Sequence, residues 1–570
     1  MIDQPSFRNL IFRLGFGLFM ASFGIVTFAQ KAESQVSTDA VRLKVDLSVE
    51  TGPMNPAWAW FGYDEPNYTY MKDGKKLLSE IAALSPVPVI VRTHNLLTTG
   101  DGSASLKWGS TNVYTEDKNG KPVYDWTIFD RIIDTFIERG MKPLVELGFM
   151  PEALSTKPTP YRHSWPDTFA TGWAYPPNDY DKWAELVFQL TKHCMSRYGQ
   201  AEVESWYFEV WNEPNIMYWQ GTMEEYFKMY DYAAWALKKA CPKAIIGGPH
   251  TTSPRDEKAA NWLKSFINHC INGKNYKTGE KGSPLDYVGF HAKGSPKLID
   301  GHVQMNINYQ LKDISRGFEI VASFPELKNI PIIIGESDPE GCAACSVARN
   351  PENNYRNGTL YSSYEAAAFA RKYALADQFK VNFKGAVTWA FEFEDQPWFA
   401  GFRDLATNGV DKPVLNVFRL FGMMKGNRVA VSGGAYNLST MCENGVKSDI
   451  PDINAMASKD KNSVSVMVWN YHDDDLAANA SPVKIDVPGL TTAKVLVHEY
   501  RIDKENSNSY EVWKNMGSPQ NPTPEQYKIL ENAGGLKMFA SPFWANTKNG
   551  SLELTLNLPR QGVSLFQLTW

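Results

Sequence analysis

An alternation of short apolar strands with amphipathic helices is the feature that most constrains the fold of this chain. The segment "DWTIFDRIIDTFIERGMKPLVELGF" (125–149) shows one unit of it. Apolar residues between Ile128 and Ile137 recur at the three- and four-residue spacing of one helical face. Gly140 follows, where a left-handed cap is favoured. The run "PLVEL" (143–147) then predicts a strand.

Eight such strands can be placed before about residue 425. They are expected at Ala57–Phe61, Val87–Arg92, Leu144–Gly148, Trp206–Trp211, Ala244–Gly248, Tyr287–His291, Pro331–Gly335 and Gly385–Phe391. Eight strands with helices between them predict an α/β fold, a (β/α)8 TIM barrel over residues 53–425. A doubly wound sheet is the alternative, but no glycine-rich phosphate loop follows the first strand.

The pattern changes to a period of two after residue 425. The run "SLELTLNLP" (551–559) alternates leucine with polar residues, and "VKIDV" (483–487) alternates likewise. Residues 426–570 are therefore predicted to form an accessory antiparallel β-sandwich. Because "RLKVDLSVE" (42–50) has the same alternation, residues 30–52 are expected to supply an N-terminal strand of that sandwich. Its aromatic residues lie at scattered intervals, which favours an interdomain seam over a sugar-stacking platform: Trp469, Tyr471, Tyr500 and Trp513.

The first 29 residues have the pattern of a targeting segment. Arg8 and Arg13 precede an apolar run (14–29) that ends in small-residue spacing. This predicts a secretory signal peptide (1–29) and a secreted or periplasmic protein, with no membrane span after cleavage. An uncleaved N-terminal anchor is the alternative.

Export would expose the cysteines to an oxidising compartment. Cys342 and Cys345 are expected to hold the loop after the seventh strand, bonded to each other or to a nearby partner; two free thiols are the alternative. No second Cys-x-x-Cys or His-x-x-His accompanies them, which disfavours zinc.

Charge and composition restrict the classes of partner. The net charge is −5 and no basic excess is present, which disfavours a nucleic-acid partner. Aromatic residues make up 13% of the chain, including 18 Trp and 26 Tyr. Such rings suit stacking against sugars, although a large core with wide loops explains most of them.

Two carboxylates directly follow predicted strands. The fourth strand runs into "FEVWNEPN" (208–215), which presents Asn212 and Glu213, and the seventh, "IPIIIGES" (330–337), ends in Glu336. The carboxyl ends of barrel strands form the active face, so the two glutamates are expected to face each other across the mouth. Glycoside hydrolysis needs such a pair. For Asn-Glu-Pro alone, a helix-capping turn is the alternative.

Further polar and aromatic residues lie at or near the ends of other strands. We predict that they contact substrate: His94, Glu146, His291, Trp389 and Glu394. For His94, His291 and Glu146 a hydrogen-bonded structural role is the alternative.

These motifs resemble those of glycoside hydrolase family 39, in clan A. The resemblance rests on "FEVWNEPN", "VIVRTHN" (89–95), "KPLVELGFMPEAL" (142–154) and "YRIDKENSNSYEVWKNMGSPQNPTPEQY" (500–527), the last similar to the β-xylosidase branch. It implies that Glu213 is the general acid/base and Glu336 the nucleophile. It also implies a 2-OH contact for Asn212, another hydroxyl contact for His94, and a place near the nucleophile for His291.

The resemblance further implies retaining hydrolysis of terminal β-D-xylosyl units, without a cofactor or a metal. This chain departs from the family at "HAKG" (291–294) and "GESDPEGCAAC" (335–345), which are expected to surround the sugar. Lys293 has two interpretations, a contact to an anionic or sulfated sugar and a solvated surface lysine.

The sequence therefore predicts a secreted retaining exo-glycosidase that removes β-D-xylosyl residues from plant or algal oligo- or polysaccharides. An α-L-arabinofuranosidase or another exo-glycosidase is the nearest alternative. A non-catalytic glycan-binding protein and a polysaccharide lyase are alternatives of other classes. Whether the chain forms an oligomer is left open.

Overall fold

A closed parallel barrel forms the larger part of the computed structural model, which describes residues 40–162 and 171–570. The expected signal peptide lies outside the described residues. The barrel strands, in chain order, are β2 (Trp60–Tyr63), β3 (Ile90–Thr93), β6 (Lys142–Leu147), β7 (Tyr207–Val210), β8 (Ile245–Thr251), β9 (Tyr287–Lys293), β12 (Pro331–Asp338), β13 (Asn382–Ala386) and β14 (Thr388–Trp389). The TIM-barrel prediction is confirmed.

The eighth strand closes the barrel in two pieces. β13 pairs with β12 and β14 pairs with β2, each in parallel. Val387 lies between the pieces, and its N–H and C=O both bond to β12, to Ile334 O at 2.8 Å and from Ser337 N at 2.9 Å. β9 and β12 run further than the sequence predicted, to Lys293 and Asp338. These extensions supply side chains to the barrel mouth.

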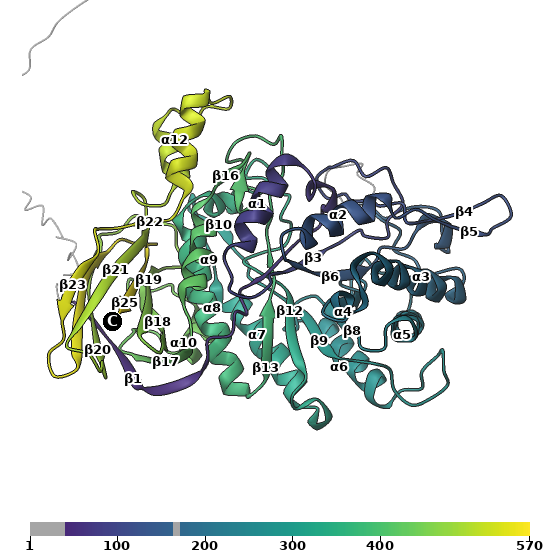
Figure 1. Ribbon diagram of the computed structural model, residues 1–570, viewed down its shortest axis with the longest axis horizontal. Helices are drawn as coiled ribbons and strands as arrows, with labels where there is room; N and C mark the ends of the chain where they lie inside the picture. Colours follow the sequence, from purple (N-terminus) through teal and green to yellow (C-terminus); the bar gives the residue numbers. More distant parts are fainter. Residues whose placement is uncertain (1–39, 163–170) are drawn as a thin grey trace, which may run out of the picture. The chain divides into compact units, whose positions relative to one another are not determined.

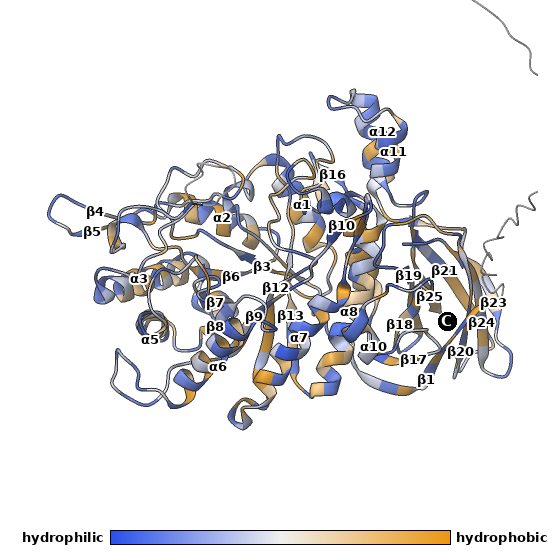
Figure 2. Cartoon of the chain, turned by 180° about the vertical axis from the view of Figure 1, so that it is seen from behind, coloured by the Kyte–Doolittle hydropathy of each residue, from blue (hydrophilic) through white to orange (hydrophobic). Residues whose placement is uncertain are grey.

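Helices cover the outside of the barrel (Figure 1). Many carry hydrophobic residues on one side and hydrophilic residues on the other (Figure 2). Gly140 adopts φ 69° just past α2, as its position predicts. The covering helices are α1 (Lys72–Ala82), α2 (Thr127–Ile137), α3 (Tyr180–Tyr198), α4 (Gln200–Val203), α5 (Met223–Ala240), α6 (Glu257–Asn272), α7 (Ile307–Ala322), α8 (Thr359–Phe379) and α9 (Pro413–Met423).

The loops between these strands and helices contain short elements. They are η1 (Pro66–Tyr68), β4 (Tyr114–Glu116), β5 (Pro122–Tyr124), η2 (Glu152–Leu154), β10 (Lys297–Ile299), β11 (His302–Gln304), η3 (Pro325–Leu327), η4 (Pro351–Asn357), β15 (Ala406–Thr407) and β16 (Val410–Asp411). None of the described helices combines the length and the apolar composition needed to cross a membrane.

The remaining strands form one ten-stranded sheet. They are β1 (Val41–Pro53), β17 (Asn427–Ser432), β18 (Asp452–Asp460), β19 (Ser463–Tyr471), β20 (Ser481–Pro488), β21 (Lys494–Ile502), β22 (Lys537–Met538), β23 (Phe543–Asn546), β24 (Ser551–Leu558) and β25 (Val563–Thr569). Strands from both ends of the strand order contribute to one apolar core, so the sheet folds over on itself as an accessory β-sandwich.

The first described strand lies inside this sheet. β1 pairs antiparallel with β17 and parallel with β20. Leu43 and Val45 are buried in the sandwich core while Lys44 between them is exposed, as the period of two predicts. The parallel pair departs from an all-antiparallel sheet. It is possible because β1 reaches the sheet from a distant part of the chain and needs no hairpin.

The sandwich packs on α8 of the barrel. Arg371 of α8 forms an ion pair with Asp452 at 2.8 Å and lies over the Trp469 ring at 5.0 Å. The Tyr364 and Tyr471 rings are 5.9 Å apart. Trp469 and Tyr471, two of the aromatic residues assigned from the sequence to a seam, therefore contact the barrel.

Three further helices belong to the C-terminal part, α10 (Leu438–Asn444), α11 (Ser509–Asn515) and α12 (Pro524–Gly534). Trp513 of α11 packs 4.9 Å from Phe399, which lies in the loop after β14. A third predicted seam residue thus touches a loop at the barrel mouth. The exact domain boundaries near residues 53 and 425 stay predictions.

Replacing Arg371 by Met should destabilise the protein through this seam. Asp452 is fully buried and would lose its cation, so we expect the free energy of unfolding to fall by about 3–5 kcal/mol. Arg316→Met is the matched control, because its partner Glu319 is 56% exposed, and it should cost less than about 1 kcal/mol. Denaturant unfolding of both variants measures the difference, and equal losses would contradict the seam assignment.

Candidate active site

Glu213 is positioned by an unusual backbone path at the end of β7. Trp211 and Glu213 adopt left-handed conformations, with φ of 74° and 46°. Such conformations cost free energy in residues other than glycine and are concentrated at functional sites. The Glu213 N–H donates to His250 O at 3.0 Å, which fixes this turn. The Glu213 carboxyl then meets His291 Nδ1 at 2.8 Å.

Glu336 lies on β12, close to Glu213. One of its oxygens is 2.6 Å from Lys293 Nζ, and the other is 3.3 Å from Arg92 Nη1. Single atoms of Glu213, His291 and Glu336 all lie within 4.8 Å of one another. Retaining glycosidases hold their two carboxyl groups about 5–5.5 Å apart, whereas inverting enzymes need a wider gap. The observed separation therefore suits a retaining reaction.

The two carboxyl groups have opposite electrostatic surroundings. Burial, together with the charge of Glu336, raises the pKa of Glu213 to about 8. Burial also acts to raise the pKa of Glu336, but the Lys293 ammonium and the Arg92 guanidinium hold that pKa well below its usual range. Near neutral pH one group is thus an acid and the other a carboxylate, which are the two starting forms that a double displacement needs.

Arg92 joins the ends of three strands. It is fully buried on β3 and donates to Glu209 of β7 at 2.8 Å and to the Asn212 amide oxygen at 3.0 Å, in addition to its contact with Glu336. The Trp389 ring lies 4.9 Å from the guanidinium carbon. The contact with Arg92 fixes the Asn212 amide and leaves its NH2 group as a donor.

His94 is held between acidic residues. Its Nδ1 lies 2.8 Å from Asp64, and its Nε2 lies 3.1 Å from Glu146 and 3.7 Å from Glu336. Glu146 is fully buried, and burial raises its pKa well above the usual range. The Trp389 ring lies 4.3 Å from the His94 ring.

The structure thus gathers most of the predicted site residues around the two glutamates: Asn212, His94, Glu146, His291 and Trp389. Glu394 is different, because its carboxylate accepts from the Asp73 N–H at 2.9 Å and caps the first turn of α1. Sugar contacts by these residues stay predictions.

Lys293 is not a solvated surface lysine, and that interpretation was wrong. Its side chain is only 13% exposed and lies between two carboxylates, 2.6 Å from Glu336 and 2.7 Å from Asp338. The sequence pattern predicted that the sixth strand ends at His291. Two more residues of β9 pair with β12 and carry Lys293 into the barrel mouth.

Sequence reasoning missed a second layer of charged residues. Glu209 lies 2.8 Å from His250 Nε2, and burial lowers the pKa of this histidine to about 4, so the imidazole is neutral near neutral pH. Arg403 lies 3.5 Å from Asp338. A charged residue inside an otherwise apolar strand marks Glu209 in the sequence, and the spacing Glu-x-Asp marks Asp338, whereas no local signal marks Arg403.

A glycine makes room for this layer directly before Glu336. A Cβ added to Gly335 would lie 2.0 Å from His250 Nδ1, a separation that the packed atoms cannot tolerate. The strand therefore needs glycine here because the imidazole occupies the space of a side chain.

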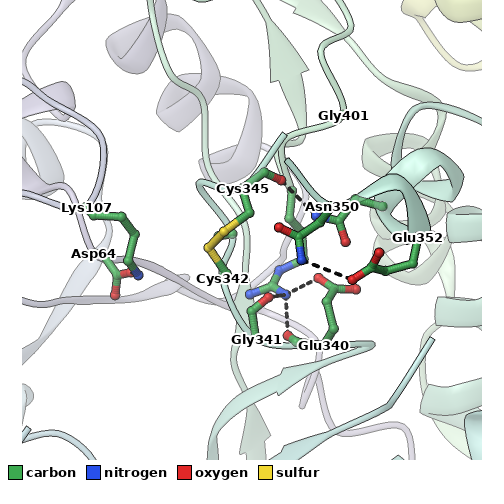
Figure 3. Close-up of a disulfide and its surroundings, with 12 residues drawn as sticks. Asp64, Lys107, Glu340, Gly341, Cys342, Cys345, Asn350, Glu352 and Gly401 are labelled. Atoms are coloured by element: carbon green, nitrogen blue, oxygen red, sulfur yellow. Dashed lines mark hydrogen bonds and ion pairs between the residues drawn. A yellow bond between two sulfur atoms is a disulfide. The ribbon is translucent and has the colours of Figure 1, made fainter. Parts of the chain in front are cut away.

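Cys342 and Cys345 form a disulfide, the first of the predicted alternatives (Figure 3). Glu340 lies beside this loop, where Arg356 pairs with it and donates to Cys345 O at 2.8 Å. The other four cysteines are free: Cys194, Cys241, Cys270 and Cys442. The loop after β12 is thus closed and pinned close to the active site.

The trio of Glu213, His291 and Glu336 has the spacing of a metal site. Its surroundings do not suit a metal ion, however, because the Lys293 ammonium 2.6 Å from Glu336 already occupies the place of a cation. A second positive ion at the same carboxylate would be repelled. The arrangement therefore suits two carboxyl groups in opposite protonation states, with His291 beside them, better than it suits a metal ion.

The model of glycosyl hydrolases family 39 matches residues 41–549. The chain belongs to glycosyl hydrolase family 39. It is 28% identical to a β-xylosidase of Caldicellulosiruptor saccharolyticus over 449 residues, which cover 76% of this chain and 82% of that enzyme. It is 25% identical to an α-L-iduronidase of Mus musculus over 446 residues, covering 72% of this chain and 63% of that enzyme.

Membership of family 39 agrees with the fold. The crystal structure of a monomeric β-xylosidase from Caulobacter crescentus CB15 has a TM-score of 0.72 and 22% identity, covering 93% of this chain and 99% of that one. The protein is a glycoside hydrolase, and its substrates are carbohydrates.

The titration of Glu213 should depend on Glu336. We expect Glu213 to lose its proton near pH 8, and at a lower pH in Glu336→Gln because the neighbouring negative charge is gone. Carbon-13 NMR of labelled glutamate carboxyls measures both values. Glu394→Gln is the control and should leave the Glu213 titration unchanged. An unchanged Glu213 titration in Glu336→Gln would contradict this electrostatic coupling.

Proposed function

We propose that this family 39 enzyme is an exported retaining exo-β-xylosidase. The observation that carries the proposal is the pair of Glu213 and Glu336, within 4.8 Å of each other and with pKa values shifted in opposite directions. The similarity to β-xylosidases over most of both chains supports the choice of sugar. The N-terminal sequence pattern supports export.

In the first step Glu336 attacks the anomeric carbon while Glu213 gives its proton to the leaving oxygen. The glycosidic bond breaks, and an ester bond forms between the sugar and Glu336. This ester removes the negative charge that helps to raise the pKa of Glu213, so Glu213 can then act as a base. It takes a proton from water, which attacks the same carbon and releases Glu336 as a carboxylate.

Asn212 and His94 are the residues proposed to hold the sugar. The Asn212 amide oxygen is engaged by Arg92, so its NH2 group is the donor left for a 2-OH contact. His94 is oriented by Asp64 at 2.8 Å. Arg92 thus holds both Asn212 and Glu336, which links one proposed sugar contact to one of the reacting carboxylates.

Azide should separate the roles of the two glutamates. Glu213→Ala should retain the first step on aryl xylosides with good leaving groups, and added azide should restore turnover and give the β-configured glycosyl azide. Glu336→Ala should lose both steps, and azide should give only the α-configured product. Loss of the general acid/base should cost about 10²–10⁴-fold on substrates with poor leaving groups.

Product analysis by NMR checks this assignment. An α-configured azide from Glu213→Ala, or near-normal rates in Glu336→Ala, would show that the roles are assigned wrongly. Glu152→Ala offers a matched control, since Glu152 is exposed in η2 and should behave as the wild type.

A second candidate is a glycosidase for uronic acids, and Lys293 is the observation that favours it. A buried ammonium beside the attacking carboxylate could pair with the carboxylate of a uronic acid. The similarity to α-L-iduronidases supports this candidate. The first candidate remains preferred because Lys293 already has two anionic partners, Glu336 and Asp338.

A panel of aryl glycosides separates the candidates. We expect the highest kcat/KM for the β-D-xyloside, with the α-L-arabinofuranoside, the β-D-glucoside and the α-L-iduronide at least about tenfold lower, as a difference of about 1.4 kcal/mol in transition-state binding gives. Preference for the iduronide would favour the second candidate. Binding of oligosaccharides without hydrolysis of any glycoside would contradict both.

A further inference from the structure

Two neighbouring strands carry matched charged pairs at the barrel mouth. β9 ends in His291-Ala-Lys293, and β12 ends in Glu336-Ser-Asp338. In the parallel register His291 lies opposite Glu336, and Lys293 lies opposite Asp338. Side chains two residues apart on a strand point to the same side. All four side chains therefore meet on one side of the two strands.

Lys293 contacts both carboxylates of the neighbouring strand, the one directly opposite and the one diagonal to it. Its ammonium is 2.7 Å from Asp338, which lies opposite on β12, and 2.6 Å from Glu336, two residues earlier on the same strand. Asp338 is fully buried, accepts the Trp389 N–H at 2.8 Å and lies 3.5 Å from Arg403. The anchor of the lysine is thus itself fixed by the backbone of β14 and by a second cation.

The two partners of Lys293 have different fates in a double displacement. Glu336 loses its negative charge when it becomes an ester, and Asp338 does not. An ammonium held by Glu336 alone would be a buried, unpaired charge in the ester intermediate, which is costly. With Asp338 as a second partner it stays charged and in place throughout.

We propose that Lys293, anchored by Asp338, sets the charge of Glu336 before attack and its ability to leave afterwards. Lys293 is in this sense a positioning residue that acts through the nucleophile. In the first step it keeps the attacking oxygen ionised. In the second step the bond between the sugar and Glu336 breaks, its electron pair returns to the carboxylate, and the ammonium stabilises the returning charge. The inference rests on the proposed role of Glu336.

Other charged and titratable groups also face Glu336, and they stay in place in the test below. They are Arg92 of β3, His94 after β3, Glu213 after β7 and His291 of β9, with Glu146, Glu209, Asp338 and Arg403 around them. Of the two ammonium or guanidinium groups that touch Glu336, Lys293 is the closer, at 2.6 Å against 3.3 Å for Arg92. Its removal should therefore change the titration of Glu336 most.

The test compares the pH dependence of kcat/KM in the wild type, Lys293→Met and Lys293→Arg, with an aryl β-xyloside or the best aryl glycoside of the panel. Without the cation Glu336 binds its proton more tightly, so the acid limb should move to higher pH in Lys293→Met, by at least about one unit. Lys293→Arg should stay within about half a unit of the wild type. The basic limb belongs to Glu213 and does not decide the question.

A second measurement follows from the leaving ability of Glu336. A carboxylate with a raised pKa is a better nucleophile and a poorer leaving group. Above its acid limb, Lys293→Met should accumulate the glycosyl ester and release a pre-steady-state burst of aryl alcohol larger than that of the wild type. A purely structural role would lower the rates without moving the acid limb or enlarging the burst.

Two further variants keep the test decisive. Lys293→Gln retains a hydrogen-bond donor between the carboxylates and removes the charge, and it replaces Lys293→Met if that variant does not fold. Lys142→Met is the matched control, since Lys142 pairs with Glu202 at the start of β6 and not at its carboxyl end. Its acid limb should match the wild type.

An acid limb that stays in place in folded Lys293→Met or Lys293→Gln would overturn the inference. So would a limb in Lys293→Arg equal to that of Lys293→Met. Failure of the proposed function is a separate result, because it would appear as activity in Glu336→Ala or as no hydrolysis of any glycoside by the wild type.

Discussion

The buried guanidinium of Arg92 is the interaction on which the active face depends. It is fully buried and contacts Glu209, Asn212 and Glu336 from two other strands. A charge at that depth is tolerated only when its partners are all present, since loss of one leaves the others uncompensated. The same guanidinium contacts both Glu336 and the Asn212 amide, so it fixes the relative positions of these two groups at the barrel mouth. The residues that compensate the buried charge are therefore also the residues that shape the candidate active site.

Local patterns predicted the barrel, the sandwich and the approach of Glu213 and Glu336 at the barrel mouth. Strand and helix periods depend on neighbours in sequence, and Glu213 and Glu336 stand out because each follows an apolar strand directly. The second layer could not be predicted in the same way. Whether Lys293 is exposed or buried depends on the pairing register of β9 and β12, which involves residues far apart in the chain. For Glu394 the sequence predicted a role in the site that the structure does not support. Its position after the eighth strand predicted a substrate contact, but its carboxylate caps the start of α1.

The choice between a neutral and an acidic sugar depends on how many carboxylates can pair with the Lys293 ammonium at once. Lys293 already lies between two carboxylates, and the carboxylate of a uronic acid would be the third. The carboxylate of such a substrate would have to compete with Glu336 or Asp338 for Lys293. Xylose carries no charge and leaves both ion pairs of Lys293 intact. This electrostatic argument favours a neutral sugar, although the family 39 relatives include enzymes of both kinds.

The place of β1 has a consequence for how the chain is made. β1 lies inside the ten-stranded sheet, between β17 and β20, while residues 54–426 separate it from β17. During synthesis β1 emerges several hundred residues before its partners β17 and β20. Pairings of such long sequence separation form slowly, because the intervening chain must first be ordered. The sheet around β1 can therefore be completed only after β17 and β20 have been synthesised, late in the chain.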